Sequence, residues 1–419
     1  MGDINTMLRD QGLLAKQAAR MMATASSVTR NQALTAMANA LRKQITVILA
    51  ANQEDIEVGR QKGMSGQMLD RLLLTEQRVE DMAVGLETLV SLPDPLGEVV
   101  AASRRPNGLE ISQIRVPLGV VGLIYEARPN VTADAAGICI KTGNAIMLRG
   151  GSEAINSNRA IVDTIAAAAV NAGMPTGAIQ LVASIERESA TQMMRLNGLI
   201  DVLIPRGGAG LIRSVVENAT VPVIETGVGN CHVYVDKSAD LKMAQDIVFN
   251  AKVQRPSVCN AAETLLVHQA IAREFLPAMI ERLQATKVEV RGCEITQQLG
   301  KNIVPATEED FATEFLQLIL AVKVVADLEE AINHIQKYGS GHTEAIVTND
   351  YQNSRRFTHE IDAACVMVNA STRFTDGFQF GLGAEMGIST QKLHARGPMG
   401  LKEMTTTKYV VNGDGQIRT

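Results

Sequence analysis

Residues 119–151, GVVGLIYEARPNVTADAAGICIKTGNAIMLRGG, decide the fold class of this chain. The apolar run over 119–125 has the length and hydrophobicity of a strand that is buried on both faces. The alanine-rich stretch 133–140 suits a helix, and 145–148 is a second short apolar strand. The order strand, helix, strand predicts a parallel sheet that is covered by helices.

The same alternation continues toward the C-terminus. Further segments of the first α/β unit are strands at 179–182, 202–204, 221–224 and 233–235, with helices at 157–172 and 211–218. A second α/β unit is expected to hold helices at 239–248, 269–285 and 328–337, and strands at 265–267, 322–325, 345–347 and 366–369. Two α/β units therefore account for most of the chain.

The flanking segments follow different patterns. Residues 1–92 are rich in helix formers, and their apolar side chains recur at helical spacing. Segments 98–104 and 109–116 predict a hairpin, because Asn107-Gly108 suits a tight turn with positive φ. This hairpin has few large apolar residues for a core of its own, so we expect it to pair with another subunit. Residues 405–411 predict a final strand.

Composition excludes several classes of protein. A net charge of −5, with 3% aromatic residues and no tryptophan, argues against a nucleic-acid-binding protein. Five scattered cysteines without a CxxC motif fit a reducing, cytoplasmic location and predict neither a disulfide framework nor a metal site. No apolar run approaches the roughly 20 residues that cross a membrane, and no secretory signal is expected.

One cysteine has the surroundings of a nucleophile. Cys259 stands among small and polar residues, and two cationic side chains, Lys252 and Arg255, precede it within seven positions. Nearby positive charge favours the reactive thiolate over the thiol. The competing interpretation is an inert, packed thiol, which is the commoner fate of a cysteine. Cys139, by contrast, lies on an apolar helix face and is expected in the core.

Glycine clusters follow several of the expected strands. They are Arg149-Gly150-Gly151, Arg206-Gly207-Gly208-Ala209-Gly210 and Thr226-Gly227-Val228-Gly229. In open α/β sheets ligands bind at the carboxyl ends of strands, and glycine lets the backbone approach a phosphate. The clusters indicate a nucleotide site or, alternatively, simple tight turns, since no GxGxxG is present.

The chain also resembles a known family. The motifs that carry the resemblance are YEARPNVT (125–132), KTGNA (141–145), LRGG (148–151), IPRGGAG (204–210), RPSVCN (255–260), VNASTRF (368–374), FGLGAE (380–385) and STQKLHARGPM (389–399). Over almost its whole length the chain is similar to the γ-glutamyl phosphate reductases, a divergent branch of the aldehyde dehydrogenase superfamily.

The resemblance implies an α/β fold with two parallel-sheet domains and a small β flap. Residues 1–96 and 117–235 would form the cofactor domain, and 236–390 the catalytic domain. The hairpin 97–116 and the tail 391–419 would form an oligomerisation flap, which implies a homo-oligomer, either dimer or tetramer.

The resemblance also implies catalytic roles. Cys259 occupies the position of the nucleophile, and Glu225 matches the acid of the superfamily's Glu-Leu-Gly-Gly motif. Because Glu126-Ala127-Arg128-Pro129 replaces Trp-Asn-Phe-Pro, the usual side-chain donor to the oxyanion is missing unless Asn130 substitutes for it. Arg128, Arg255 and Arg373 are candidates to hold the substrate's phosphate or α-carboxylate.

Binding of the cofactor is assigned in the same way. Glu314 resembles the acid that holds the nicotinamide ribose. Arg149, Gly150, Gly151 and Ser152 replace a Lys-Pro-Ser-Glu motif near the adenosine ribose. A cation without an acid favours a 2′-phosphate, and therefore NADPH. Residues 207 and 208, both glycine, complete the predicted cofactor set.

The implied activity is NADPH-dependent reduction of L-glutamyl 5-phosphate to L-glutamate 5-semialdehyde and phosphate, the second step of proline biosynthesis. A complex with glutamate 5-kinase, which makes the labile acyl phosphate, is a further expectation. The alternatives are a hydrolytic aldehyde dehydrogenase, a cofactor-free thiol acyltransferase and a non-catalytic nucleotide-binding protein.

Overall fold

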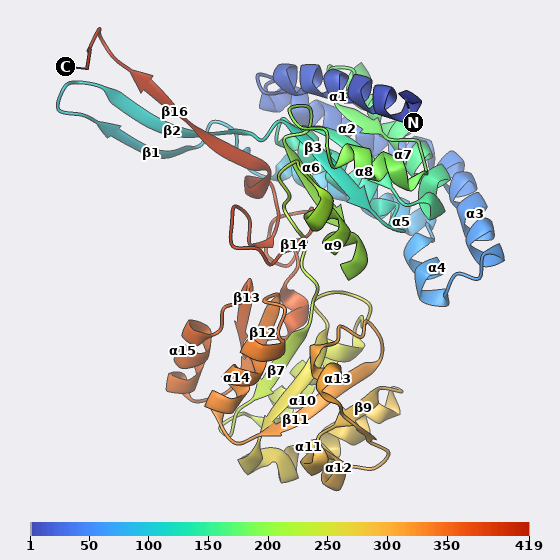
Figure 1. Cartoon of the computed structure of the whole chain (residues 1–419), viewed down its shortest axis with the longest axis vertical. Helices are drawn as coiled ribbons and strands as arrows, with labels where there is room; N and C mark the ends of the chain where they lie inside the picture. The colour runs from blue at the N-terminus through green and yellow to red at the C-terminus, as the bar shows by residue number, and fades with distance from the viewer. Residues whose placement is uncertain (1, 419) are drawn as a thin grey trace. The chain divides into compact units, whose positions relative to one another are not determined.

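The computed structural model describes residues 2–418, and the chain divides by its contacts into two units. Unit 1 comprises the residues up to Thr226, together with 381–387 and the tail from Met399. Unit 2 comprises residues 227–380 and 388–398. Each unit contains a parallel sheet, which confirms the predicted α/β class (Figure 1).

Unit 1 is built on a four-stranded parallel sheet in the order β5-β4-β3-β6. The strands are β3 (Val120–Tyr125), β4 (Ala145–Gly150), β5 (Ile179–Leu181) and β6 (Val202–Arg206). The helices are α1 (Gly2–Met22), α2 (Ser27–Lys43), α3 (Ile45–Gln61), α4 (Gly66–Leu72), α5 (Glu76–Ser91), α6 (Asn130–Lys141), α7 (Ile155–Asn171), α8 (Arg187–Met193) and α9 (Ala209–Asn218). Short 3-10 turns lie at η1 (Ser152–Ala154) and η3 (Lys402–Met404).

Helices cover this sheet in layers (Figure 1). Helices α6 and α7 pack beside the strands, with α2, α3 and α5 against them, while α1 packs with α8 and against β4. All six residues of β3 are buried, as expected of a central parallel strand. Cys139 on α6 is fully buried, which confirms its place in the core.

The predicted hairpin is present. Strands β1 (Val99–Arg104) and β2 (Glu110–Pro117) pair antiparallel, and β16 (Thr405–Asn412) adds to the other edge of β2. Gly108 has a φ of +91°, as the Asn-Gly turn requires. The three strands extend away from the helices of unit 1 (Figure 1). Every residue of β1 is exposed, so this flap buries little of its own surface.

Unit 2 has a seven-stranded parallel sheet in the order β10-β9-β11-β8-β7-β12-β13. Its strands are β7 (Cys231–Val235), β8 (Ala262–His268), β9 (Glu289–Gly292), β10 (Val304–Pro305), β11 (Ile319–Val325), β12 (Thr343–Val347) and β13 (Cys365–Val368). Its helices are α10 (Leu241–Val253), α11 (Gln269–Ala285), α12 (Glu294–Leu299), α13 (Glu308–Ala312), α14 (Leu328–Tyr338) and α15 (Tyr351–Glu360). A 3-10 turn, η2 (Thr372–Phe374), and the small ladder β14 (Ile388–Ser389) with β15 (Gly397–Pro398) complete it.

Both faces of this sheet are apolar. In β7, Val233 and Val235 pack with α10 and α11, whereas Tyr234 between them packs with α14 and α15. Successive side chains of a strand point to opposite faces, so a strand buried on both faces needs a continuous apolar run. Such runs predicted β7, β8, β11, β12 and β13, whereas β9 and β10 were not predicted.

Three details of the prediction are wrong. The expected catalytic domain 236–390 and flap tail 391–419 have other limits, because 381–387 belong to unit 1 and 388–398 to unit 2. The segment 233–235 was assigned to the first α/β unit and to a domain ending at 235, but β7 belongs to the sheet of unit 2. The segment 221–224 forms no strand and makes only one bridge, between Leu203 and Val223. A short apolar run does not itself specify which sheet it joins, because only long-range pairing decides that.

Candidate active site

Cys259 lies in the segment 254–261, which we call the nucleophile turn, between α10 and β8. Helix α10 ends at Val253, and Pro256 follows shortly after. A residue before proline is disfavoured in helical conformation, so Arg255 cannot extend the helix. The turn closes with a hydrogen bond from Ala261 N to Val258 O at 3.0 Å. Cys259 is half-buried there, so its thiol is not sealed in the core.

The turn stands at the amino edge of the sheet of unit 2, against the segment that enters β7. An added Cβ on Gly229 would lie 1.6 Å from the Cys259 carbonyl oxygen, so only glycine fits there. The Cys231 thiol donates to the same oxygen, with Sγ at 3.1 Å. The β7–β8 register shifts between Cys231 and His232, and such bulges often lie beside active sites.

Glu314 reaches the same place from the segment after α13. Its Oε1 accepts a hydrogen bond from the Gly229 backbone N–H at 2.7 Å. The structure therefore brings the predicted ribose-binding acid to the backbone that contacts Cys259. Its role toward a cofactor remains a prediction.

Lys252 is not a free cation beside the thiol. Its ammonium group pairs with the Glu263 carboxylate at 2.5 Å, and both side chains are fully buried. Burial lowers the pKa of Lys252, and burial raises the pKa of Glu263 to about 7 against the opposing effect of the lysine. The pair ties α10 to β8 on either side of the nucleophile turn.

Two arginines remain as candidate anion binders in unit 2. Arg255 is exposed within the nucleophile turn, and Arg373 donates from Nε to Gln254 Oε1 at 2.8 Å. The pKa of Arg373 is lowered, first by burial and then by the charge of Arg255. Two guanidinium groups close enough to repel each other would bind an anion well, because the anion relieves that repulsion.

Sequence reasoning missed Asn260, the neighbour of the thiol. Its Nδ2 donates to Thr375 O at 2.8 Å and to Arg373 O at 3.4 Å, and the side chain is buried. It joins the nucleophile turn to η2 and so fixes the backbone of Arg373. An asparagine beside a candidate nucleophile was the available signal.

The other predicted residues belong to unit 1. The glycine edge, as we call it, lies at the ends of β4 and β6, at the carboxyl edge of the parallel sheet, and comprises Gly150, Gly151, Gly207 and Gly208. An added Cβ on Gly151 would lie 2.1 Å from Glu153 Oε1, and one on Gly207 would lie 2.6 Å from Glu126 Oε2. Side-chain carboxylates therefore fill the space that these glycines leave.

Glu126 was not predicted as a site residue. Its Oε2 accepts from Gly208 N at 2.8 Å, at the first turn of α9, and Glu153 Oε1 accepts from Ala127 N at 2.8 Å. These backbone N–H groups thus hold anionic oxygens, as donors at a helix start do. The glycine edge fits an anion, which would replace the chain's own carboxylates.

Arg149 and Ser152 flank Gly150 and Gly151. The Arg149 guanidinium donates to the carbonyls of Gly150 at 3.1 Å, Ile185 at 3.1 Å and Glu186 at 3.2 Å. Its pKa is lowered, chiefly by burial. Ser152 is exposed at the start of η1. In this arrangement Arg149 ties β4 to the segment before α8.

The remaining candidates lie around α6 and after β6. Asn130, at the start of α6, donates from Nδ2 to Asp134 Oδ2 at 3.1 Å, so one of its N–H groups is engaged. Burial raises the pKa of Asp134 to about 6. Arg128 and Glu225 are half-buried in irregular segments. The structure therefore groups Cys259, Arg255, Arg373 and Glu314 in unit 2, and the rest of the predicted set in unit 1.

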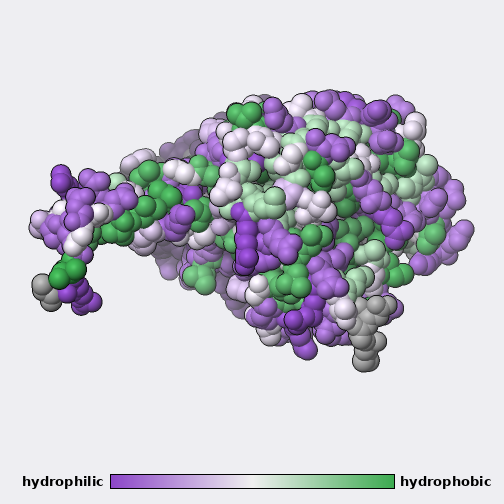
Figure 2. All heavy atoms as spheres, turned by 90° about the horizontal axis from the view of Figure 1, so that it is seen from above, coloured by the Kyte–Doolittle hydropathy of each residue, from purple (hydrophilic) through white to green (hydrophobic). Residues whose placement is uncertain are grey.

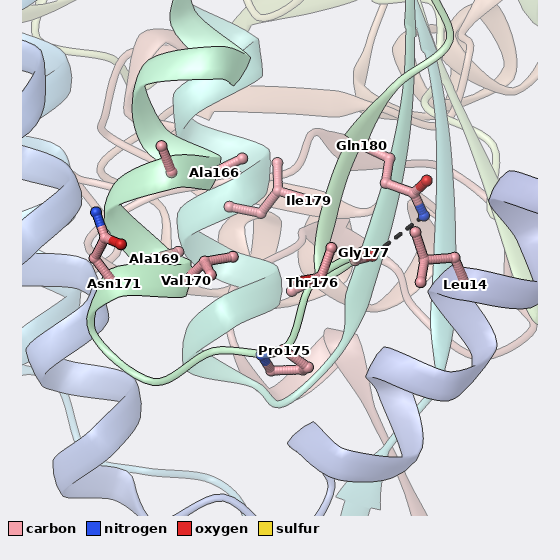
Figure 3. A pocket seen from close by; sticks show the side chains of 12 residues that line it. Leu14, Ala166, Ala169, Val170, Asn171, Pro175, Thr176, Gly177, Ile179 and Gln180 are labelled. Atoms are coloured by element: carbon pink, nitrogen blue, oxygen red, sulfur yellow. Dashed lines mark hydrogen bonds between the residues drawn. The ribbon is translucent and has the colours of Figure 1, made fainter.

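A cavity in unit 1 lies between α1, α7 and the segment leading to β5 (Figure 3). It measures about 470 Å³ and is lined mainly by small apolar side chains such as Ala166, Val170 and Ile179. Leu14 of α1 faces it, and Gln180 donates to Gly177 O at 3.2 Å. The lining carries no titratable group, so it offers nothing to acid–base or covalent chemistry.

Among residues 2–418, no group of three or more His, Cys, Asp or Glu side chains is arranged to hold a metal ion. No described helix is both long and apolar enough to cross a membrane.

Comparison with known proteins identifies the family. The chain matches the model of the aldehyde dehydrogenase family over residues 13–312 and 301–410. A gamma-glutamyl phosphate reductase of Heliobacterium modesticaldum is 66% identical over 408 residues, covering 97% of this chain and 98% of that protein. One of Clostridium novyi is 60% identical over 416 residues, covering 99% of this chain and all of that protein.

Comparison with solved structures supports the same family. The gamma-glutamyl phosphate reductase of Thermotoga maritima has a TM-score of 0.95 at 49% identity, covering 98% of this chain and 100% of that one. An acetylating aldehyde dehydrogenase of Geobacillus thermoglucosidasius has a TM-score of 0.72 at 19% identity, covering 100% and 98%, which shows a shared fold alone. The chain therefore belongs to the aldehyde dehydrogenase family and, within it, to the group of the gamma-glutamyl phosphate reductases.

Proposed function

We propose that this chain reduces L-glutamyl 5-phosphate to L-glutamate 5-semialdehyde and phosphate, with Cys259 as the nucleophile and NADPH as the reductant. The observation that carries the proposal is the nucleophile turn, where a half-buried thiol stands in a braced turn beside two mutually repelling arginines. Family membership supplies the reaction class, since the relatives that match over nearly their whole length carry the name of this reductase.

The chemistry of the chain's own residues is a thiol substitution. The Cys259 thiolate attacks the γ-carbonyl carbon of the acyl phosphate, phosphate leaves, and a thioester to Cys259 remains. Arg255 and Arg373 stabilise the charge of the departing phosphate or hold the α-carboxylate. NADPH, when bound, supplies the hydride that reduces the thioester, and collapse of the adduct releases the semialdehyde and the thiolate.

The oxyanion that forms during attack needs donors. The backbone N–H of Cys259 is the first candidate, and Asn130 is the second, through the N–H that it does not give to Asp134. Glu225 has no water to activate in a reduction, so we assign it no step in the forward reaction. Arg128 joins Arg255 and Arg373 in the set proposed to bind the substrate's anionic groups.

The glycine edge supports a dinucleotide site in unit 1. The Gly208 N–H already holds the carboxylate of Glu126, and the Ala127 N–H holds that of Glu153, so these backbone donors suit the pyrophosphate of NADPH. Arg149 is proposed to favour NADPH over NADH, with Ser152 beside it. To contact a 2′-phosphate, the guanidinium would exchange its bonds to backbone carbonyls for bonds to a full negative charge.

The flap is proposed to pair with another copy of the chain. Side chains exposed on it include Val99 and Val100 of β1 and Tyr409 and Val411 of β16. Figure 2 shows apolar surface along this ribbon. A β ribbon that leaves such residues exposed gains stability by pairing. A complex with the kinase that makes the acyl phosphate, and a cytoplasmic location, remain predictions.

The test is the reverse reaction, in which glutamate 5-semialdehyde and NADP⁺ are mixed with and without inorganic phosphate. We expect NADPH to form only when phosphate or arsenate is present, and Cys259→Ala to lower the rate at least about 1,000-fold while NADPH still binds. Cys293→Ala is the matched control, because Cys293 is also half-buried in unit 2. It should keep the wild-type rate.

Other outcomes identify the alternatives. NADPH formation without phosphate would indicate a hydrolytic aldehyde dehydrogenase. An absence of NADPH binding, with thiol-dependent acyl transfer intact, would indicate the acyltransferase. If the cofactor bound equally well before and after alkylation of Cys259, and no turnover occurred, the chain would be a non-catalytic nucleotide-binding protein.

A further inference from the structure

A second thiol lies directly behind the nucleophile turn. Cys231 is the first residue of β7, and its side chain is fully buried. Its Sγ lies 3.1 Å from the Cys259 carbonyl oxygen and 3.7 Å from His342 Nδ1. The roles assigned above to Cys259 and the arginines make no use of this thiol.

The oxygen that Cys231 contacts is held from two sides. The Gly229 backbone lies so near it that a Cβ would come within 1.6 Å, and the Cys231 thiol donates to it. A carbonyl fixed in this way fixes the plane of the following peptide, and with it the ψ angle of Cys259. The direction in which the Cys259 side chain leaves the turn is thereby set.

The surroundings of Cys231 keep it protonated and therefore able to donate. Glu344 approaches it from β12, Glu263 from β8, Glu314 from the segment after α13, and Cys259 from the turn. Lys252 of α10 is the facing cation and is paired with Glu263. Burial first, and then these negative groups, raise the pKa of Cys231 well above its ordinary value. The Cys231 thiol therefore remains a neutral donor.

We propose that Cys231 is a positioning residue for the reaction at Cys259, acting through the hydrogen bond from its thiol to the Cys259 carbonyl oxygen. This inference rests on the proposed function, because it deepens the role of the same turn. A hydroxyl at position 231 would preserve the bond, whereas a methyl group would remove it.

The experiment compares Cys231→Ala with Cys231→Ser in two measurements. The first is amide hydrogen exchange of residues 254–261, which needs no turnover. Loss of one hydrogen bond should speed exchange in Cys231→Ala about fivefold, and Cys231→Ser should stay within about twofold of wild type. The second is the phosphate-dependent assay, where Cys231→Ala should lower kcat about tenfold with both KM values unchanged. Cys231→Ser should recover at least half of kcat.

Cys139→Ala is the matched control, because Cys139 is an equally buried thiol in the core of unit 1. It should change neither exchange at 254–261 nor kcat. Wild-type exchange and wild-type kcat in Cys231→Ala would overturn the proposal. Equal loss in Cys231→Ser and Cys231→Ala would also overturn it, since the volume of the sulfur would then matter rather than the hydrogen bond. If wild type shows no phosphate-dependent turnover, the proposed function fails, while the exchange measurement still decides whether Cys231 holds the turn.

Discussion

In unit 2 the candidate nucleophile stands at the amino edge of a parallel sheet, whereas in unit 1 the glycine edge stands at the carboxyl edge. The nucleophile turn is held by contacts within the protein interior. The Gly229 backbone packs closely against the Cys259 carbonyl oxygen, and the Lys252–Glu263 ion pair is fully buried. At the glycine edge the Gly208 N–H is held by the Glu126 carboxylate, and the Glu153 carboxylate beside Gly151 is held by the Ala127 N–H. We infer that the nucleophile turn is rigid, whereas the backbone donors at the glycine edge can exchange a carboxylate for a bound anion.

The sharpest test of this difference is alanine in place of glycine in each region. Gly229→Ala puts a methyl group within 1.6 Å of the Cys259 carbonyl oxygen, so the turn must move by more than 1 Å. We expect kcat/KM to fall about 1,000-fold and alkylation of Cys259 by iodoacetamide to change in rate. In Gly207→Ala the methyl group meets the end of the flexible Glu126 side chain, so Cys259 should be alkylated at the wild-type rate. An equal change in the alkylation rate of Cys259 in both variants would contradict the comparison.

The buried ion pair predicts the next largest effect. Lys252→Met leaves the Glu263 carboxyl without its partner in an apolar interior, which should cost about 3 kcal/mol of unfolding free energy. Burial holds the pKa of Glu263 high, so the loss should grow as the pH rises through about 7. Urea denaturation at pH 6 and pH 8 measures this. Lys252→Met with Glu263→Gln should regain most of the stability, and a double variant no better than the single one would show that the pair is not the cause.

At the glycine edge we expect a smaller effect, and one that strengthens cofactor binding instead of reducing activity or stability. Glu126→Gln keeps an oxygen that can accept from Gly208 N but removes a negative charge from the proposed pyrophosphate site. We expect NADPH to bind about threefold more tightly, because two like charges no longer compete for one donor. Fluorescence titration with NADPH gives the dissociation constant. Glu153→Gln is the companion variant, and weaker binding in both would show that the carboxylates support the site rather than occupy it.

The smallest effect concerns Asp134, which receives the hydrogen bond from Asn130. Burial raises its pKa to about 6 from an ordinary value near 4. The contribution of the protonated Asp134 carboxyl to the free energy of unfolding is fully present below about pH 4. It is lost as the pH rises through about 6. Asp134→Asn should therefore match wild type at pH 4 and melt about 2 °C higher at pH 7.5. Thermal melts across this range check the sign, and a stabilisation confined to low pH would contradict it.

Sequence patterns predicted most of the secondary structure. Apolar runs predicted most strands of both sheets, although not β9 and β10, and Asn107-Gly108 predicted the hairpin that the structure contains. The failures came where a run is short. Segment 221–224 has the composition of a strand but finds no partner beyond one bridge, and β7 pairs in the other unit.

The sequence also singled out Cys259, Arg255 and Arg373, which the structure places in one unit. It could not show that Lys252 is neutralised by Glu263, since the residues lie on a helix and a strand that meet only through folding. Asn260, Cys231 and Glu126 were missed for a related reason. Asn260 makes two hydrogen bonds to backbone groups distant in the sequence, and Cys231 and Glu126 make one each. No spacing of residues in the chain predicts such bonds.

The sequence by itself determined the α/β class, the cysteine to examine and the family, because periodicity and long motifs are local properties of the chain. The tertiary structure alone decided which cation remains available near Cys259, which carbonyl the Cys231 thiol holds, and which backbone donors carry carboxylates. Those outcomes depend on burial and on distances between segments that are far apart in the chain. Free energies of charge and hydrogen bonding change with burial, and burial exists only after folding.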